Sequence, residues 1–337
     1  MARRVRMTDV AKAAAVSTMT VSRVLNGNPH VTEETRRAVF AVVEKLRYQR
    51  NELARSLREQ RTRQIGILIP NLFDPFFANC SHAVSLVAKQ HHYSVVIATS
   101  NEDPDDEFAE ACRMVNRHVE GVVVIPAQAN GASRLLSPEF DNLPIVTLDR
   151  PLEGTRCDSV LVQNKRGGQL ATDHLIGLGH KRIVCISLGS HLYTMRTRQQ
   201  GYREAMAAAG LKAEVYTVTD LLETSSAAVR ILLAGKRPPT ALFCTNNMVT
   251  RHVLHALQSM NIHPPQKMAL VGFDDFETAE LLQPGITVIR QPVELLGRTA
   301  AEALFARLTD GKANKSPKRI VLSVELVIRG SCGTNLS

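Results

Sequence analysis

A run of short polar side chains and one arginine, at helical spacing, stands near the start of the chain. Drawn as a helix, residues 18–25 separate into a polar face and an apolar face. Hydroxyl groups donate and accept hydrogen bonds, and a guanidinium can donate two parallel ones, so the polar face suits the edges of planar groups and phosphates. The polar face holds Thr18, Met19, Ser22 and Arg23, and the apolar face holds Val21, Val24 and Leu25.

The elements that must position these side chains are two short helices joined by a tight turn within residues 9–26. Ser17 has the position and type of an N-cap for the second helix. A helix that projects an arginine and short polar groups from a small apolar core is typical of the second helix of a helix-turn-helix, which enters the DNA major groove. The sequence therefore predicts a sequence-specific DNA-binding protein.

The distribution of charge supports this prediction. Of 337 residues, the first 63 hold 14 Lys or Arg and 6 Asp or Glu, whereas the remainder holds 27 and 26. Nearly all of the net charge of +9 therefore lies on less than a fifth of the chain. A solvated basic tail would explain the charge alone, but its coincidence with the helix pair favours contact with phosphates.

A third helix and a basic connector complete the N-terminal part. Thr32 can cap a helix whose first turn holds Glu33 and Glu34, which gives a helical DNA-binding domain over residues 1–48. Residues 49–63 are polar and basic, with a short apolar edge. We expect them to form a hinge helix that folds against DNA and a second copy of the chain; an ordinary flexible linker is the alternative.

From residue 64 onward, apolar strand patterns alternate with helical ones. Most strand candidates, including one over 319–328, are rich in Val and Ile, as parallel strands buried on both faces require. These βα units are too many for a single compact sheet, so we expect two α/β lobes. Ligand sites in such folds lie beyond the carboxyl ends of the strands.

Several other classes of protein are disfavoured. No apolar run is long enough for a membrane span, the Arg-rich N-terminus is unlike a secretory signal, and no common catalytic motif occurs. The six cysteines are widely spaced and form no C-x-x-C motif, which favours reduced thiols in a cytosol. We expect no metal and no cofactor. A solute-binding protein and a sugar-metabolising enzyme on the same α/β scaffold remain the alternatives.

Along nearly its whole length the chain resembles the lactose/galactose repressor (LacI/GalR) family of bacterial transcription regulators. The resemblance implies a helix-turn-helix head, a hinge and a two-lobed core similar to type I periplasmic binding proteins, in which the chain crosses between lobes three times. We expect the core over 64–331, with one lobe over about 64–163 and 291–318 and the other over about 164–290 and 319–331. The motifs that carry the resemblance are Asp9-Val-Ala, Val16-Ser17, Thr20 to Asn26, Ala54 to Leu57, Asn71 to Phe77, Val271 to Asp275 and Arg290-Gln-Pro292.

The family pattern also implies roles for residues of the head and hinge. Thr18 and Met19 occupy the positions that most affect operator choice, and Arg23 the third base-reading position, where bidentate contact with guanine is usual. Leu57 matches the leucine that wedges into the minor groove, and Ala54 lets two hinge helices approach. Tyr48-Gln49-Arg50-Asn51 lacks the proline common in relatives, which leaves the start of the hinge less defined. Phosphate contacts are expected from Ser17, Ser22 and Asn26.

For the core, the resemblance implies an effector site between the lobes. Phe76 is expected in the pocket and Phe77 in the core, and one carboxylate usual in the family is an amide in the pair Asn246-Asn247. Arginine, acid and amide groups around an aromatic ring suit polyols, so a sugar or sugar acid is expected, and a purine is less favoured. The expected effector-binding residues are Phe76, Asp149, Arg150, Arg196, Asn246, Asp274 and Gln291.

The resemblance also implies a mechanism and a set of partners. A ligand that binds the two arrangements of the lobes unequally would change the spacing of the hinges and the affinity for a palindromic operator. Two heads must read the two half-sites, and the C-terminus has no heptad tail, so a homodimer is expected. Double-stranded DNA, an effector and a second copy are the partners, in a bacterial cytoplasm.

Overall fold

The chain folds into two compact units, residues Met1–Thr62 and Arg63–Ser337. The computed structural model describes residues 5–25, 27–48, 61–127, 133–152, 157–219, 221–310 and 316–333.

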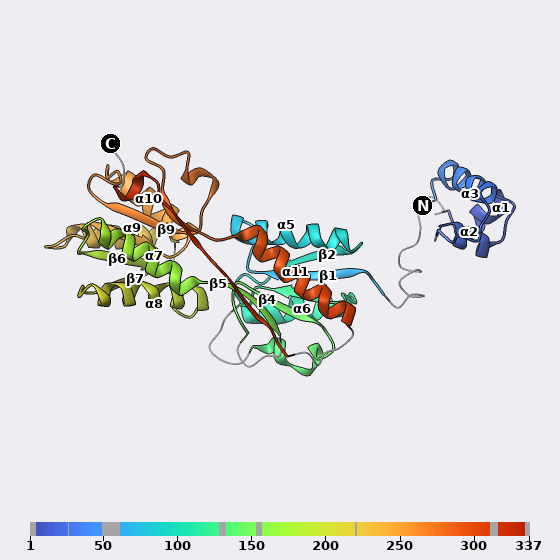
Figure 1. The fold of residues 1–337 in the computed structure, drawn as a ribbon, viewed down its shortest axis with the longest axis horizontal. Helices are drawn as coiled ribbons and strands as arrows, with labels where there is room; N and C mark the ends of the chain where they lie inside the picture. The colour runs from blue at the N-terminus through green and yellow to red at the C-terminus, as the bar shows by residue number, and fades with distance from the viewer. Residues whose placement is uncertain are drawn as a thin grey trace. The chain divides into compact units, whose positions relative to one another are not determined.

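The N-terminal unit is a three-helix bundle around five buried side chains. Its helices are α1 (Met7–Ala13), α2 (Thr18–Leu25) and α3 (Glu33–Lys45) (Figure 1). The Ser17 hydroxyl accepts a hydrogen bond from the backbone N–H of Thr20 at 3.0 Å, and Thr32 caps α3 through the N–H of Thr35, so both predicted caps are confirmed. The small core consists of Val10, Ala11, Val21, Val24 and Val39.

The first lobe of the larger unit is built on a parallel sheet of six strands. Residues of β1 alternate between its two faces, so that Ile65, Ile67 and Ile69 pack against one helical layer and Leu68 against the other. In spatial order the strands are β11 (Arg319–Leu322), β5 (Asp158–Val162), β4 (Ile145–Leu148), β3 (Val122–Val124), β1 (Gln64–Ile69) and β2 (Ser94–Thr99).

The second lobe repeats this plan with one reversed strand at its edge. β12 pairs antiparallel with β10, whereas the other neighbours are parallel. The order is β12 (Glu325–Val327), β10 (Thr287–Arg290), β9 (Ala269–Phe273), β8 (Ala241–Cys244), β6 (Ile183–Ser187) and β7 (Glu214–Thr217).

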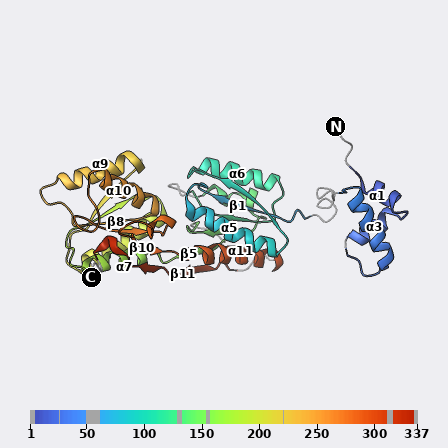
Figure 2. The same cartoon turned by 90° about the horizontal axis from the view of Figure 1, so that it is seen from above.

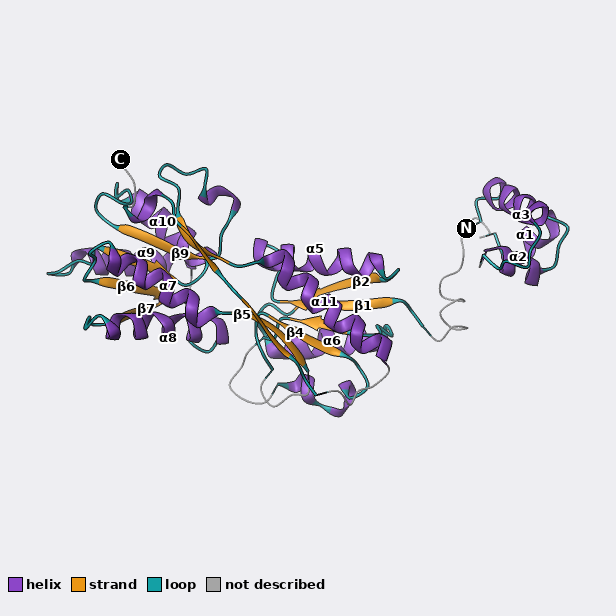
Figure 3. Ribbon diagram, viewed as in Figure 1, coloured by secondary structure: helices purple, strands orange, loops and turns teal. Residues whose placement is uncertain are grey.

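Helices cover both faces of each sheet, as Figures 2 and 3 show. In the first lobe, α5 and α11 pack together on one face, and α6 covers the other. In the second lobe, α9 and α10 lie on one face, and α7 and α8 on the other. The helices are α5 (Pro75–Gln90), α6 (Pro104–Asn116), α7 (Asn164–Gly177), α8 (Tyr193–Ala208), α9 (Leu221–Ala234), α10 (Asn247–Ser259) and α11 (Val293–Asp310).

The chain crosses between the lobes at three places, and the third differs from the sequence-based expectation. The crossings follow β5, β10 and β11. The single strand expected over 319–328 is two strands, because residues 319–322 pair with β5 in the first sheet and residues 325–327 pair with β10 in the second. The expected boundary between residues 318 and 319 is therefore wrong: the crossing lies at residues 323–324. A continuous β pattern does not reveal which sheet each half joins.

Helices α7 and α8 approach unusually closely because glycines stand at their contact. A Cβ atom added to Gly201 would lie 2.0 Å from the carbonyl oxygen of Lys165, and one added to Gly168 would lie 2.2 Å from that of Arg198. The absence of these side chains lets the backbones touch. The first residue of α7, Asn164, thereby comes within hydrogen-bonding reach of Arg198 in α8.

Gly201→Ala is expected to lower the melting temperature of the core by several degrees. The added methyl group meets backbone rather than a movable side chain, and overpacking of this kind costs roughly 1–3 kcal/mol. Thermal unfolding followed by circular dichroism measures the change.

Gly177→Ala, near the end of α7, is the matched control. No atom lies within 4 Å of its added Cβ, so the alanine is expected to keep or slightly raise the melting temperature. Equal destabilisation by the two variants would contradict the close-packing argument.

Candidate effector site and DNA-reading helix

The polar face of α2 is open to solvent. Thr18, Met19 and Arg23 are exposed, with Met19 at 64%, whereas Val21 and Val24 point into the core of the head. Ser22 is half-buried, and the Ser17 hydroxyl is engaged by the backbone of Thr20. Helix α2 can therefore present these side chains to a partner without unfolding. The predicted DNA contacts Asn26, Ala54 and Leu57 lie outside the described residues.

In the core unit, each lobe places an aspartate directly after a central strand, in the same unusual conformation. Asp149 follows β4 with φ 64°, and Asp274 follows β9 with φ 71°. Their backbone N–H groups bond to the neighbouring strands, at Val160 and Ile289. Left-handed backbone is uncommon for residues other than glycine and is concentrated at functional sites. Both aspartates are more than nine-tenths buried.

A second matched pair begins a helix in each lobe. Asp74 caps α5 by accepting from the N–H of Phe76 at 3.0 Å, and Asn246 caps α10 by accepting from that of Val249 at 2.9 Å. The next residue, Asn247, donates from Nδ2 to Asp74 Oδ1 at 2.9 Å and so joins the two lobes. Asn246, the predicted ligand-binding amide, thus serves its own helix, and its neighbour makes the contact between lobes.

Arg198 is the central cation of the second lobe. Its Nε donates to Asn164 Oδ1 at 2.8 Å, and its Nη1 donates to the carbonyl of Thr245 at 2.7 Å and to Asp274 Oδ2 at 3.3 Å. The guanidinium lies over the ring of Phe273, 3.6 Å from its centroid. The Arg198 side chain is 2% exposed.

Arg196, the arginine expected to contact the effector, lies elsewhere. Helix α8 begins at Tyr193, so both arginines lie in its first two turns. Two positions on a helix differ by about 200°, so Arg196 is exposed while Arg198 faces the sheet. The expected place of Arg196 in the polar site is taken by Arg198.

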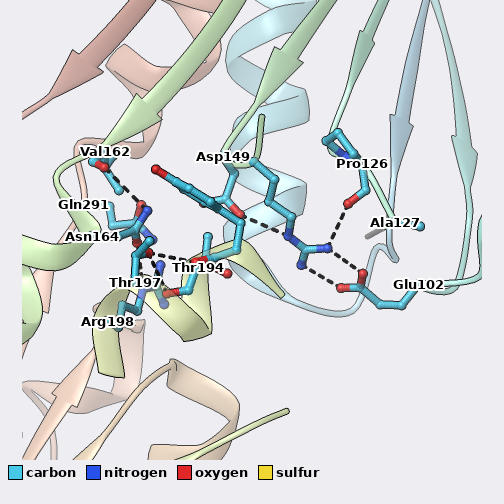
Figure 4. Close-up of polar contacts among 12 residues, drawn as sticks. Glu102, Pro126, Ala127, Asp149, Val162, Asn164, Thr194, Thr197, Arg198 and Gln291 are labelled. Atoms are coloured by element: carbon cyan, nitrogen blue, oxygen red, sulfur yellow. Dashed lines mark hydrogen bonds and ion pairs between the residues drawn. The ribbon is translucent and has the colours of Figure 1, made fainter. Parts of the chain in front are cut away.

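Arg150 is committed to an ion pair inside the first lobe. Its Nη1 and Nη2 donate to the two carboxylate oxygens of Glu102 at 2.5 and 2.7 Å, and Nη1 also donates to the carbonyl of Pro126 (Figure 4). Its Nε lies 3.6 Å from Asp149 Oδ2. Such a paired arginine holds Asp149 and the strand ends in place, which differs from the direct effector contact that the sequence suggested.

The remaining predicted residues divide between the polar site and the core. Gln291 is 4% exposed and donates from Nε2 to Asp274 Oδ1. Phe76 and Phe77 are equally buried and meet edge to face in the hydrophobic core of the first lobe, so burial does not separate their roles as expected. Phe76, Asp274 and Gln291 also line a pocket of about 620 Å³ between the lobes.

We call Asp74, Asp149, Arg198, Asn247, Asp274 and Gln291 the interlobe polar cluster. Burial raises the pKa of Asp149 to about 6, against the opposing charges of Arg150 and Arg198. Burial also raises the pKa of the Cys80 thiol, and the charges of Asp149, Asp74 and Asp274 raise it further, so all three carboxylates converge on one region. Asp74 and Asn247 were not identified from the sequence, although the Asp-Pro pair before an apolar helix is a recognisable cap signal.

Comparison with known proteins places this geometry in a family. Residues 6–51 match the model of bacterial regulatory proteins of the lacI family, and residues 172–332 match a periplasmic binding protein-like domain. The ribose operon repressor of Escherichia coli K12 is 34% identical over 96% of this chain and 99% of its own length. The chain belongs to the LacI family.

Other comparisons agree. The HTH-type transcriptional repressor PurR of Aliivibrio fischeri strain MJ11 is 32% identical, over 96% of this chain and 97% of its own. The lac repressor dimer bound to operator and the anti-inducer ONPF aligns with a TM-score of 0.87 at 25% identity, covering 98% and 99% of the two chains. This LacI-family member is therefore a ligand-responsive transcriptional repressor with a DNA-binding head and an effector-binding core. Within the described residues, none of the helices combines the length and apolar character needed to cross a membrane.

The carboxylate of Glu107 makes the stability of the first lobe depend on pH. Glu107 Oε2 accepts from the N–H of Ala127 at 2.5 Å, yet burial raises its pKa from 4.5 to about 7. The folded state therefore holds a proton that the unfolded state has lost, and stability falls as pH rises from about 4.5 through about 7. Glu107→Gln keeps an acceptor but does not titrate. Between pH 5 and pH 8, its free energy of unfolding is therefore expected to rise relative to that of the wild type by up to about 3 kcal/mol.

Melting temperatures of the two proteins at the two pH values test this. Glu110→Gln makes the same change at a partly exposed position of α6 and is the control. If the difference in melting temperature between the wild type and Glu107→Gln is the same at both pH values, Glu107 does not titrate in this range.

Proposed function

We propose that this repressor binds a sugar-like effector between its lobes, at the interlobe polar cluster, and reads a palindromic operator as a homodimer. The observation that carries the effector proposal is the convergence of carboxylates, amides and one guanidinium from both lobes. The cross-lobe bond of Asp74 with Asn247, at 2.9 Å, and the network of Arg198 with Asp274 belong to the same cluster.

The chemistry of the cluster suits a polyol. Each sugar hydroxyl donates one hydrogen bond and accepts others, so it can satisfy a carboxylate and a guanidinium at once. The Phe273 ring beneath Arg198 fixes the donor plane. The name of the relative from Escherichia coli, a ribose operon repressor, supports a sugar as the effector class. Purines, which offer fewer donors, suit the cluster less well.

Ligand binding is coupled to DNA through the arrangement of the lobes. Because the cluster includes groups from both lobes, a ligand that bridges them has different affinities for the two arrangements. That difference is the coupling free energy available to change operator affinity. We propose that catalysis plays no part in this role, and that the protein acts in the bacterial cytoplasm, where its DNA lies.

At the DNA, we propose that α2 enters the major groove of each half-site. Arg23 donates to a guanine edge, Thr18 contacts a neighbouring base, and Met19 packs on a thymine methyl group because it has no hydrogen to donate. Positioning contacts to phosphate come from Ser17, Ser22 and Asn26. Ala54 and Leu57 of the paired hinges act in the minor groove.

Arg198→Ala is expected to abolish the effect of the sugar on operator binding while leaving operator binding itself unchanged. The variant removes the donor that faces Asp274, and the head is a separate unit. A gel shift with and without sugars of a panel that includes D-ribose and cellobiose measures the response.

Arg196→Ala is the control, since Arg196 is exposed on the same helix. It is expected to keep the full response. Loss of the response in Arg196→Ala, with retention in Arg198→Ala, would refute the proposed site.

Arg23→Ala is expected to weaken binding to an operator selected from random palindromic duplexes by about 1–3 kcal/mol, while binding to a scrambled duplex changes little. Titrations at one fixed salt concentration compare the two duplexes. An equal loss on both would identify Arg23 as a phosphate contact.

A further inference from the structure

The interlobe polar cluster carries more negative than positive charge. Asp74, Asp149 and Asp274 are at most 8% exposed, and Arg198 is the cation placed among them. Asp274 raises the pKa of both other aspartates, after the larger effect of burial. The carboxylate of Asp274 therefore repels those of Asp74 and Asp149 across the junction of the lobes.

Arg150 does not correct this imbalance. Both of its terminal nitrogens bond to Glu102, whose carboxylate cancels the charge of the guanidinium. Its Nε, which has no hydrogen bond, lies 3.6 Å from Asp149 Oδ2 and so points to the protein's own carboxylate. The first lobe therefore offers the ligand a carboxylate, Asp149, in place of a cation.

The buried side-chain atoms of the cluster that have no hydrogen-bond partner are all acceptors. They are Asp149 Oδ1, Asn247 Oδ1 and Gln291 Oε1, on side chains at most 4% exposed. The orientation of the two amides follows from chemistry, because their nitrogens must face the carboxylates of Asp74 and Asp274. These three buried acceptors can each accept a hydrogen bond from a ligand that supplies hydrogens.

Asp74 occupies the central position in this arrangement. It caps α5, and one of its oxygens, Oδ1, also accepts the bond from the opposite lobe. An asparagine could make the same cap, so the cap alone does not require a charge at this position. The carboxylate adds repulsion toward any anion that enters between the lobes.

We propose that Asp74 determines the charge of the ligand: with Asp149 and Asp274 it makes the site accept uncharged polyhydroxyl ligands and reject sugar acids and sugar phosphates. This inference rests on the proposed function and narrows it. Free sugars and sugar alcohols fit, because each of their hydroxyls can donate to one of the three open acceptors. Of the two ligands expected from the sequence, the sugar acid is the one that the cluster excludes.

The test uses the full chain and sets of ligands matched in shape but not in charge. Thermal shift followed by calorimetry compares D-ribose with D-ribonate and D-ribose 5-phosphate, and D-glucose with D-gluconate and D-glucose 6-phosphate. Measurements at pH 8 keep the carboxylates ionised although burial raises the pKa values of Asp74 and Asp149. At least one uncharged member is expected to bind, with its anionic analogues weaker by ~100-fold or more.

Asp74→Asn isolates the role of the charge. The variant keeps the helix cap and removes one negative charge, and it is expected to narrow the ratio of neutral to anionic affinity about tenfold. Asp103→Asn is the matched control, because Asp103 is also an N-cap aspartate followed by proline, at an exposed position at the start of α6. It is expected to leave the ratio unchanged.

Each other result overturns the inference. The inference fails if the wild type binds a sugar acid or sugar phosphate as tightly as the matching neutral sugar. It also fails if no uncharged polyol in the panel binds. An unchanged ratio in Asp74→Asn would remove Asp74 from the role. An anionic ligand whose binding still requires Arg198 would keep the proposed effector site and refute only its charge preference, whereas a neutral ligand insensitive to Arg198→Ala would refute the site.

Discussion

The burial of one guanidinium organises the second lobe. A buried charge is tolerated only where acceptors surround it, and Arg198 obtains its acceptors from three different elements: Asn164 at the start of α7, the carbonyl of Thr245 after β8, and Asp274 after β9. These contacts require α7 and α8 to touch, which only glycines at their crossing permit. The position of the helices, the left-handed turn at Asp274 and the charge of the site therefore depend on one another.

The same requirement bears on the proposed effector site. Arg198 and Arg150 each meet a carboxylate, but Asp149 keeps one buried oxygen, Oδ1, without a donor among the described protein groups. A buried acceptor without a donor destabilises the arrangement of the lobes in which it is buried. A ligand that supplies the missing hydrogens removes that penalty only when both lobes surround it. In the proposed function, ligand binding and lobe arrangement are thus linked by the same few atoms.

The sequence predicted the class of fold and the head well, because helix periodicity, caps at Ser17 and Thr32, and Val-rich strands are local signals. It failed where partners far apart in sequence decide the outcome. The resemblance implied Arg196 as the effector-binding arginine, whereas Arg198, two positions further along α8, is the one that meets Asn164 and Asp274. The pattern over 319–328 carries no mark of the sheet change. The bond of Asp74 to Asn247 joins residues 173 positions apart, which no local pattern contains.

The three lobe crossings lie side by side. Gln163 donates its N–H to the carbonyl of Leu322, and Arg290 pairs with Glu325, so the crossing at 323–324 runs beside the other two. Adjacent connections of this kind are where the backbone can absorb a hinge rotation of one lobe against the other. Gln291 stands in this seam and also holds Asp274. A ligand bound to Asp274, as proposed above, would therefore act beside the backbone hinge, where a small rotation gives a large displacement at the far ends of the lobes.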